Sequence, residues 1–93
     1  MFKVKAQNSE EKAARINKLK KMLDSLKSSI REIQSLETGM NFSTRETAFD
    51  LILISEFKSK EDLKRYSDHP DHRQVVSYLE SIREKVAVVD YEL

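Results

Sequence analysis

Apolar residues alternate with polar ones over short stretches of this chain and recur every three or four positions over longer ones, so strands can be told from helices. Phe2 and Val4 alternate with lysines, which predicts a short first strand. Asn8 and Glu11 are spaced like the two members of a helix capping box, and a helical stripe of apolar residues follows them. This stripe predicts one long helix and consists of Ile16, Leu19, Met22, Leu23, Leu26 and Ile30.

A predicted hairpin follows this helix. The pattern becomes strand-like from Ile33 to Asn41, the polar residues 42–47 fit a loop, and a second strand runs from Phe49 to Phe57. Gly39, the only glycine, lies inside the first of these strands, where it indicates a bulge or a close backbone approach. One face of that strand carries Leu36, Thr38 and Met40.

The strand from Phe49 to Phe57 has apolar side chains on both faces. Leu51 and Leu53 point to one side, whereas Ile52 and Ile54 point to the other. A strand with two apolar faces has to be covered on both of them.

A helix break at Pro70 is the most distinctive local feature. Ser59, followed by acids, marks the start of a helix that would bury Tyr66. Pro70 has no backbone N–H and excludes His69 from the helical region, so this helix is expected to end near Asp68. Since proline is well tolerated at a first helical position, a second and differently oriented helix can begin at Pro70.

The remaining residues predict that second helix and a last strand. The helix has an apolar stripe of Val75, Leu79 and Ile82. The last strand covers residues 86–93, where side chains alternate between two faces. Val86 and Val88 occupy one face, and the other carries Ala87, Val89, Tyr91 and Leu93.

The element order is β-α-β-β-α-β with a broken second helix. It predicts an α+β fold, a ferredoxin-like sandwich whose four-stranded antiparallel sheet carries the helices on one face. The chain length suits a single domain over residues 1–93. Helices on one face leave Ile52 and Ile54 uncovered on the other, together with apolar positions of the last strand. A second copy could cover them, so we expect a homodimer in which two sheets close into one α/β barrel.

Composition and charge exclude several classes of protein. The chain has no cysteine, which excludes disulfides, thiolate nucleophiles and thiolate metal sites. It has no apolar run near the roughly 20 residues that span a bilayer, and no apolar signal region near residue 1, so we expect a cytoplasmic protein without a membrane partner. Residues 1–31 hold nine Lys or Arg against three acids but lack base-stacking aromatic residues in the helix, so we expect no nucleic-acid partner.

Several sequence blocks resemble the stress-responsive A/B barrel (Dabb) family in kind and in order. They are the Tyr66–His72 run with its Tyr-x-x-His-Pro-x-His spacing, Gly39–Ser43, Phe49–Phe57 and Val88–Tyr91. The resemblance covers most of the chain and implies a ferredoxin-like dimer with a shared barrel. Two departures concern a His that many members have on the first strand, which is missing here, and Arg31-Glu32, which stands where many members have Pro-Gly.

The same resemblance implies site residues. In the plant polyketide cyclases of this family, a Tyr and a His of the matching run act as acid and base in a pocket, which would assign these roles to Tyr66 and His72. A neutral imidazole can serve as a base near neutral pH, and a phenol can polarise a carbonyl oxygen. The pocket or corner would also include His69 and Leu51, the latter at a position where the cyclases have a His.

Two function classes therefore stay open. The first is a non-catalytic homodimeric module, involved in stress response or in binding a small apolar ligand between helices and sheet. In that case Tyr66 is a core residue, and His69 and His72 cap or bridge the broken helix. The second is a cyclase or isomerase acting on a carbonyl compound through Tyr66 and His72. A closed cavity reaching both side chains would favour the second class, and a filled core would favour the first.

We expect neither a cofactor nor a metal. The chain has no glycine-rich phosphate loop. His69 and His72 have a spacing that metal ligands use, with Asp68 and Asp71 beside them. However, Pro70 interrupts that helix, and no distant third ligand stands out.

Overall fold

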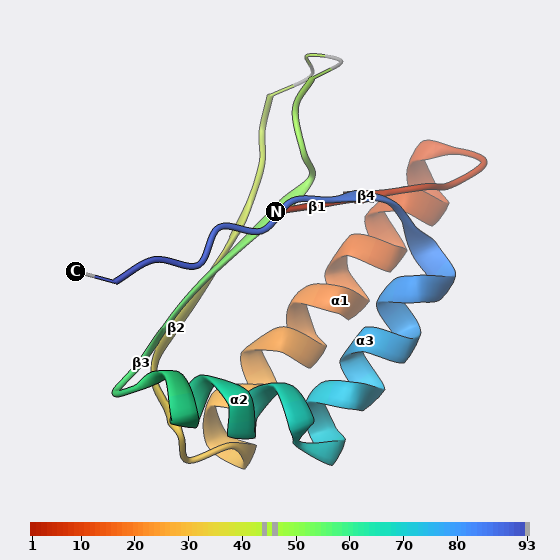
Figure 1. Cartoon of the computed structure of the whole chain (residues 1–93). Coiled ribbons are helices and arrows are strands. Elements are labelled where there is room, and N and C mark those ends of the chain that lie inside the picture. The colour runs from red at the N-terminus through yellow and green to blue at the C-terminus, as the bar shows by residue number, and fades with distance from the viewer. Residues whose placement is uncertain (44, 46, 93) are drawn as a thin grey trace.

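The computed structural model shows a four-stranded antiparallel sheet with three helices on one of its faces (Figure 1). It describes the chain except for residues 44, 46 and 93. The strands lie in the order β2-β3-β1-β4, which confirms the predicted ferredoxin-like α+β fold. The elements are β1 (Phe2–Val4), α1 (Ser9–Ser29), β2 (Ile33–Met40), β3 (Leu51–Phe57), α2 (Lys60–Asp68), α3 (Pro70–Ile82) and β4 (Arg83–Val86).

Helix α1 begins and ends where its sequence predicts. The Asn8 side chain accepts a hydrogen bond from the backbone N–H of Glu11 at 2.8 Å, which satisfies one of the free donors of the first turn. The helix ends at Ser29, and the backbone N–H of the following Ile30 bonds to the Leu26 carbonyl oxygen. The predicted apolar stripe faces the core, with Leu19 and Leu26 almost fully buried.

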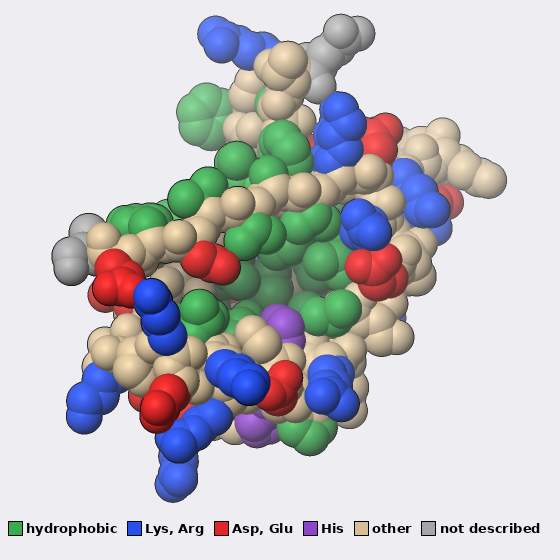
Figure 2. Space-filling view, in the orientation of Figure 1, with side chains coloured by type: hydrophobic (Ala, Val, Ile, Leu, Met, Phe, Trp, Pro, Cys, Tyr) green, Lys and Arg blue, Asp and Glu red, His purple; other side chains and the backbone are tan. Residues whose placement is uncertain are grey.

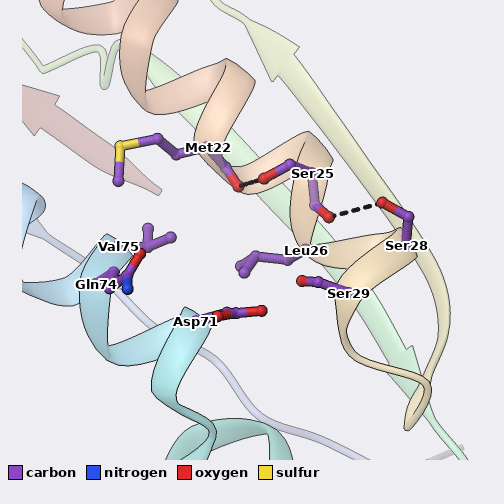
Figure 3. Close-up of a pocket in the computed structure, with 8 residues that line it drawn as sticks. All are labelled: Met22, Ser25, Leu26, Ser28, Ser29, Asp71, Gln74 and Val75. Atoms are coloured by element: carbon purple, nitrogen blue, oxygen red, sulfur yellow. Dashed lines mark hydrogen bonds between the residues drawn. The ribbon is translucent and has the colours of Figure 1, made fainter.

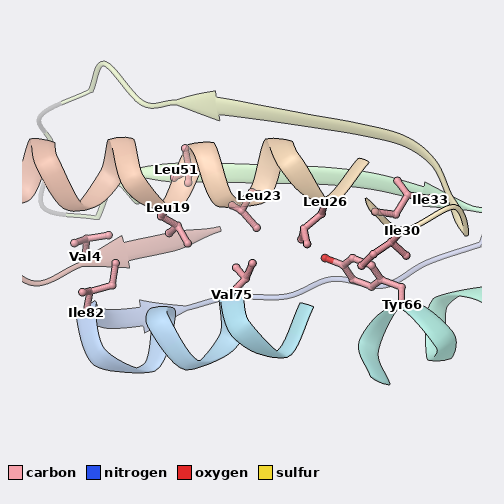
Figure 4. Packing of buried hydrophobic residues seen from close by; sticks show 10 residues of the cluster. All are labelled: Val4, Leu19, Leu23, Leu26, Ile30, Ile33, Leu51, Tyr66, Val75 and Ile82. Atoms are coloured by element: carbon pink, nitrogen blue, oxygen red, sulfur yellow. The ribbon is translucent and has the colours of Figure 1, made fainter. Parts of the chain in front are cut away.

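The core lies between the sheet and the helices (Figure 4). Its side chains come from both layers, and the described residues bury no charged side chain in it. Burying a Leu or Ile side chain stabilises a fold by about 1.5–3 kcal/mol, so this cluster is the main source of stability. The cluster consists of Val4, Leu19, Leu23, Leu26, Ile30, Ile33, Leu51, Tyr66, Val75 and Ile82.

The β2–β3 hairpin corrects the interpretation of Gly39. The irregular register of this pair lies between Ile33 and Ser35, whereas Gly39 pairs regularly with Ile52, so the expected bulge at the glycine is wrong. A Cβ atom on Gly39 would lie 3.2 Å from Cγ2 of Ile52. The close approach at this position is therefore made by a neighbouring side chain, and the backbone dihedrals do not require glycine.

The start of β3 and the loop before it differ slightly from the prediction. The strand begins at Leu51, two residues after the predicted start. Asp50, the residue before it, accepts a hydrogen bond from the Asn41 N–H at 3.0 Å and also bonds to β1. Its backbone N–H donates to the Phe2 carbonyl oxygen at 2.8 Å, and its carboxylate accepts from the Val4 N–H at 2.8 Å. The predicted loop 42–47 includes residues 44 and 46, which lie outside the described residues.

The last strand is the largest correction. Strand β4 covers Arg83–Val86, whereas the sequence predicted a strand over residues 86–93. Strand β4 pairs only with β1, which begins at Phe2, and the last rung is the exchange of backbone bonds between Met1 and Ala87. Residues 88–92 have no strand beside them in the part of the chain that the structure describes, and Leu93 lies outside that part. Three apolar side chains of the predicted strand are therefore exposed. These are Val88, Val89 and Tyr91.

Candidate functional site

The polar residues that the sequence predicted for the site lie at or near the corner between α2 and α3. Ser59 caps α2 by accepting a hydrogen bond from the Asp62 N–H at 3.2 Å, as predicted. His69 ends α2 and begins α3 with φ −65° and ψ 137°, an extended conformation that the following Pro70 enforces. Its backbone N–H still bonds to the Tyr66 carbonyl oxygen at 3.1 Å. The break therefore turns the chain without leaving its backbone unsatisfied at this residue.

The His69 side chain caps the second helix. Its Nδ1 accepts a hydrogen bond from the Asp71 N–H at 3.1 Å. An accepting Nδ1 carries no proton, so the ring proton of this neutral imidazole lies on Nε2. The Asp71 carboxylate lies 4.0 Å from the same Nδ1, and the two groups form an ion pair only when the imidazole is protonated.

Tyr66 is the buried member of the corner. Its side chain is 6% exposed, and its ring contacts Phe57 and His72 at centroid distances of 4.9 and 4.3 Å. Burial raises the pKa of the Tyr66 phenol. No hydrogen bond to its hydroxyl is found among the described residues, and no fully buried side-chain oxygen there is unsatisfied. Solvent therefore reaches the hydroxyl, although the ring is enclosed.

His72 is half-buried and has one fixed hydrogen bond. Its Nδ1 lies 3.2 Å from the Ser67 carbonyl oxygen, which can only accept, so Nδ1 donates and Nε2 of the neutral ring keeps a free lone pair. Burial lowers the pKa of His72 from its ordinary value of 6.5, although the bond to Ser67 opposes this shift. The positive charge that His69 would carry lowers the His72 pKa further. At neutral pH the ring is therefore uncharged, and a base at Nε2 is chemically feasible.

Leu51 does not lie at this corner. It is 1% exposed within the core, and in Figure 4 it lies beside Leu19 and Leu23, while Tyr66 lies at the opposite end of the cluster near Ile30. The structure therefore brings Tyr66, His69 and His72 together and leaves Leu51 apart from them.

Ile52 and Ile54 lie on the sheet face that the helices leave open. Their residues are 40% and 48% exposed, whereas Leu51 between the sheet and the helices is buried. They pair across the ladder with Gly39 and Glu37. Two large aliphatic side chains on one strand face are therefore in contact with solvent in the single chain.

Two surface cavities are lined by residues that the sequence did not single out as a site. One of about 360 Å³ lies between α1 and α3, and one of about 320 Å³ lies beside the β1–α1 loop. Neither is lined by Tyr66 or His72. The sequence signal for the first was slight: a pair of serines near the end of α1 and an acid at the start of α3.

Neither a cluster of metal ligands nor a membrane-spanning helix is present in the described part of the chain. It contains no group of three His, Cys, Asp or Glu side chains arranged to hold a metal ion. No described helix combines the length and the apolar character needed to cross a bilayer.

Comparison with protein families gives one match over the whole chain. The model of the stress-responsive A/B barrel domain family matches residues 1–93. A curated Arabidopsis thaliana protein, the stress-response A/B barrel domain-containing protein DABB1, is 47% identical over 49 residues. These residues are 53% of this chain and 23% of that protein, so the match spans less than a quarter of the curated relative.

Solved structures give matches over nearly all of the chain. A dimeric protein of unknown function with a ferredoxin-like fold from Bacteroides fragilis is 32% identical with a TM-score of 0.88, over 99% of this chain and 89% of that one. An Arabidopsis thaliana protein is 25% identical with a TM-score of 0.78, over 99% and 88%. A dimeric ferredoxin-like protein of unknown function from Jannaschia is 23% identical with a TM-score of 0.76, over 100% and 93%, and shows the shared fold alone.

Proposed function

This chain belongs to the stress-responsive A/B barrel (Dabb) family, and on that premise we propose that it is a homodimeric, non-catalytic module that binds a small apolar ligand between its sheet and its helices. The observation that carries the proposal is the pair of exposed side chains on the open sheet face, Ile52 and Ile54. Soluble proteins rarely leave a sheet face with such side chains uncovered.

The relatives support self-association. The Bacteroides fragilis structure, which is 32% identical to this chain, is described as dimeric. A second copy placed face to face would cover Ile52 and Ile54 in both chains at once, because a two-fold axis repeats the same contacts. A standard interface buries roughly 1,600 Å² in total, which is compatible with a whole sheet face.

The apolar ligand is supported by a hollow in the molecular surface. Figure 2 shows hydrophobic side chains gathered between the C-terminal segment and helices α2 and α3, with a histidine at the edge of the hollow. The Tyr66 hydroxyl, which has no hydrogen-bond partner in the described part of the chain, would offer one polar contact to a mainly apolar molecule.

A matched pair of ligands can test this binding. We expect 2-naphthol and naphthalene to bind the dimer in a fluorescence titration. Tyr66→Phe should weaken the binding of 2-naphthol by about tenfold and leave the binding of naphthalene unchanged. Tyr78→Phe is the control, because the Tyr78 ring lies on α3 under the Lys18 ammonium and is not among the aromatic contacts of Tyr66. Absence of saturable binding of either compound would reject the ligand part of the proposal and leave the dimer.

The alternative function is a cofactor-free cyclase or isomerase acting on a carbonyl compound. The contact between the Tyr66 and His72 rings and the free lone pair at His72 Nε2 favour it. Against it, the core around Tyr66 holds no charged side chain that could stabilise an oxyanion among the described residues. Turnover of a carbonyl substrate that is lost in both Tyr66→Phe and His72→Ala would establish the enzyme.

The cytoplasmic location expected from the sequence is part of this proposal, as is the expectation that neither nucleic acid nor membrane is a partner. Fractionation of cells that express a tagged chain would test the location, and a pull-down of the same chain would test the partners.

A further inference from the structure

A groove between α1 and α3 is separate from the corner and from the open sheet face. Its volume is about 360 Å³, within the range of roughly 300–1,000 Å³ that small-molecule pockets occupy. It lies between the C-terminal half of α1 and the first turns of α3 (Figure 3). Tyr66, His69 and His72 are not among its lining residues.

The deep side of the groove is apolar. It is formed by Leu26 and Val75, which belong to the core, and by Met22, which packs against it. An unbranched thioether adapts to ligands of different shape, so this surface suits a short alkyl chain.

Three serines of α1 line the groove, and Ser29 is the one that points across it toward Asp71 (Figure 3). Ser25 donates its hydroxyl proton to the Met22 carbonyl oxygen at 2.7 Å, and Ser28 donates to the Ser25 carbonyl oxygen at 3.0 Å. A hydroxyl has a single proton, so each of these oxygens has only lone pairs left for a ligand. The end of α1 adds the negative pole of the helix dipole.

The opposite wall carries a carboxylate that has no Lys or Arg within salt-bridge distance among the described residues. Asp71 projects from α3 toward Ser29 of α1, which points back across the groove (Figure 3). The nearest basic atom is Nδ1 of His69 at 4.0 Å, and it carries no proton because it accepts from the Asp71 N–H. Lys27, the base in the last turn of α1, bonds instead to the Ile33 carbonyl oxygen.

We propose that this groove binds a small amphipathic cation, a primary alkylammonium. The ammonium group lies between the Asp71 carboxylate and the Ser29 hydroxyl, whose oxygens accept its N–H donors. The alkyl chain lies on Met22, Leu26 and Val75. Charge-assisted hydrogen bonds of this kind are about twice as strong as neutral ones, so the charge of the ligand decides its selection.

Three ligands of equal chain length test the proposal on the full chain. Backbone amide NMR at neutral pH is used to follow titrations with n-hexylammonium, n-hexanol and hexanoate. We expect n-hexylammonium to shift residues 22–29 and 71–75 saturably in the millimolar range, with hexanol weaker and hexanoate without effect. Equal binding of hexanol, shifts elsewhere only, or no saturable shift with n-hexylammonium would each overturn the proposal.

Variants connect the binding to the carboxylate. Asp71→Asn keeps the backbone N–H that donates to His69 Nδ1. It is expected to weaken the binding of n-hexylammonium by about tenfold to a hundredfold. Asp68→Asn, at the end of α2 and outside the groove, is the matched control and is expected to bind like the wild type. Ser29→Ala provides a second variant, which is expected to weaken the binding of n-hexylammonium and to leave the binding of n-hexanol unchanged. Unchanged binding in folded Asp71→Asn would refute the role of the carboxylate.

Discussion

The imidazole of His72 contacts the phenol ring of Tyr66, with ring centroids 4.3 Å apart and planes inclined by 50°. The two residues belong to different helices, and their contact exists because Pro70 ends the first helix and reorients the second. The same reorientation brings Nδ1 of His72 to 3.2 Å from the Ser67 carbonyl oxygen. The ring is therefore held by the protein itself, without a ligand.

His72→Ala is expected to lower the melting temperature, because it removes one hydrogen bond and the ring contact with Tyr66. The expected loss is about 1–2 kcal/mol of unfolding free energy. Thermal unfolding followed by circular dichroism measures it. If His72 is instead a catalytic group in a ligand site, the variant should melt like the wild type and lose ligand binding or turnover, and that result would contradict the structural role.

Acidification is expected to reduce the contribution of His72 to the stability of the folded chain. Burial lowers its pKa in the folded chain, while the unfolded chain takes up the proton near 6.5. The stability that His72 contributes is thus complete above pH 6.5 and is lost as the pH falls through the lower folded pKa. The difference in melting temperature between the wild type and His72→Ala should shrink over this window. A difference that grows on acidification would show that the folded state favours the protonated ring.

Pro70→Ala is expected to leave the fold intact and to loosen the corner. Alanine allows the continued helix that proline forbids, and the unfolded chain gains freedom, at a cost of about 0.4–1 kcal/mol. Hydrogen exchange should become faster at residues 66–75, above all at the Asp71 amide that His69 caps. Unchanged stability together with unchanged exchange in this segment would mean that proline has no structural role there.

The sequence predicted most of the fold because its signals are local. The Asn8 and Ser59 caps, the stop at Pro70 and the α1 stripe each depend on residues within a few positions of one another, and each lies where expected. The last strand was misplaced because its length depends on β1, which is distant in sequence. Alternation in residues 86–93 resembles a strand, yet pairing ends at the exchange between Met1 and Ala87.

The candidate site was predictable only in part, for the same reason. The proximity of Tyr66, His69 and His72 follows from their spacing around a helix break. The position of Leu51 depends on how β3 lies against α1, which no local pattern encodes. The α1–α3 groove likewise joins residues that are distant in sequence, since Asp71 faces Ser29 only through helix packing.

Gly39→Ala tests how closely the open sheet face packs against the second copy in the proposed dimer. The new Cβ would lie 3.2 Å from Cγ2 of Ile52, which has to shift by a few tenths of an ångström. In a single chain Ile52 is exposed enough to move, so the unfolding free energy should change by less than about 1 kcal/mol. At a dimer interface the same shift disturbs close packing. We expect weaker self-association in dilution experiments, and unchanged dimer stability would place Ile52 outside the interface.

Ile54→Lys tests the dimer directly. Ile54 lies opposite Glu37 in the ladder, so a lysine there can pair with that acid and the single chain should remain folded. In a dimer that covers this face, the charge would be buried without sufficient solvation, which costs several kcal/mol, and light scattering should then report a monomer. Val76→Lys is the matched control, because Val76 is a comparably exposed aliphatic residue on α3 and should leave the dimer intact. A folded Ile54→Lys variant that remains dimeric would show that the chains associate through another surface, since this face cannot be closed over a lysine.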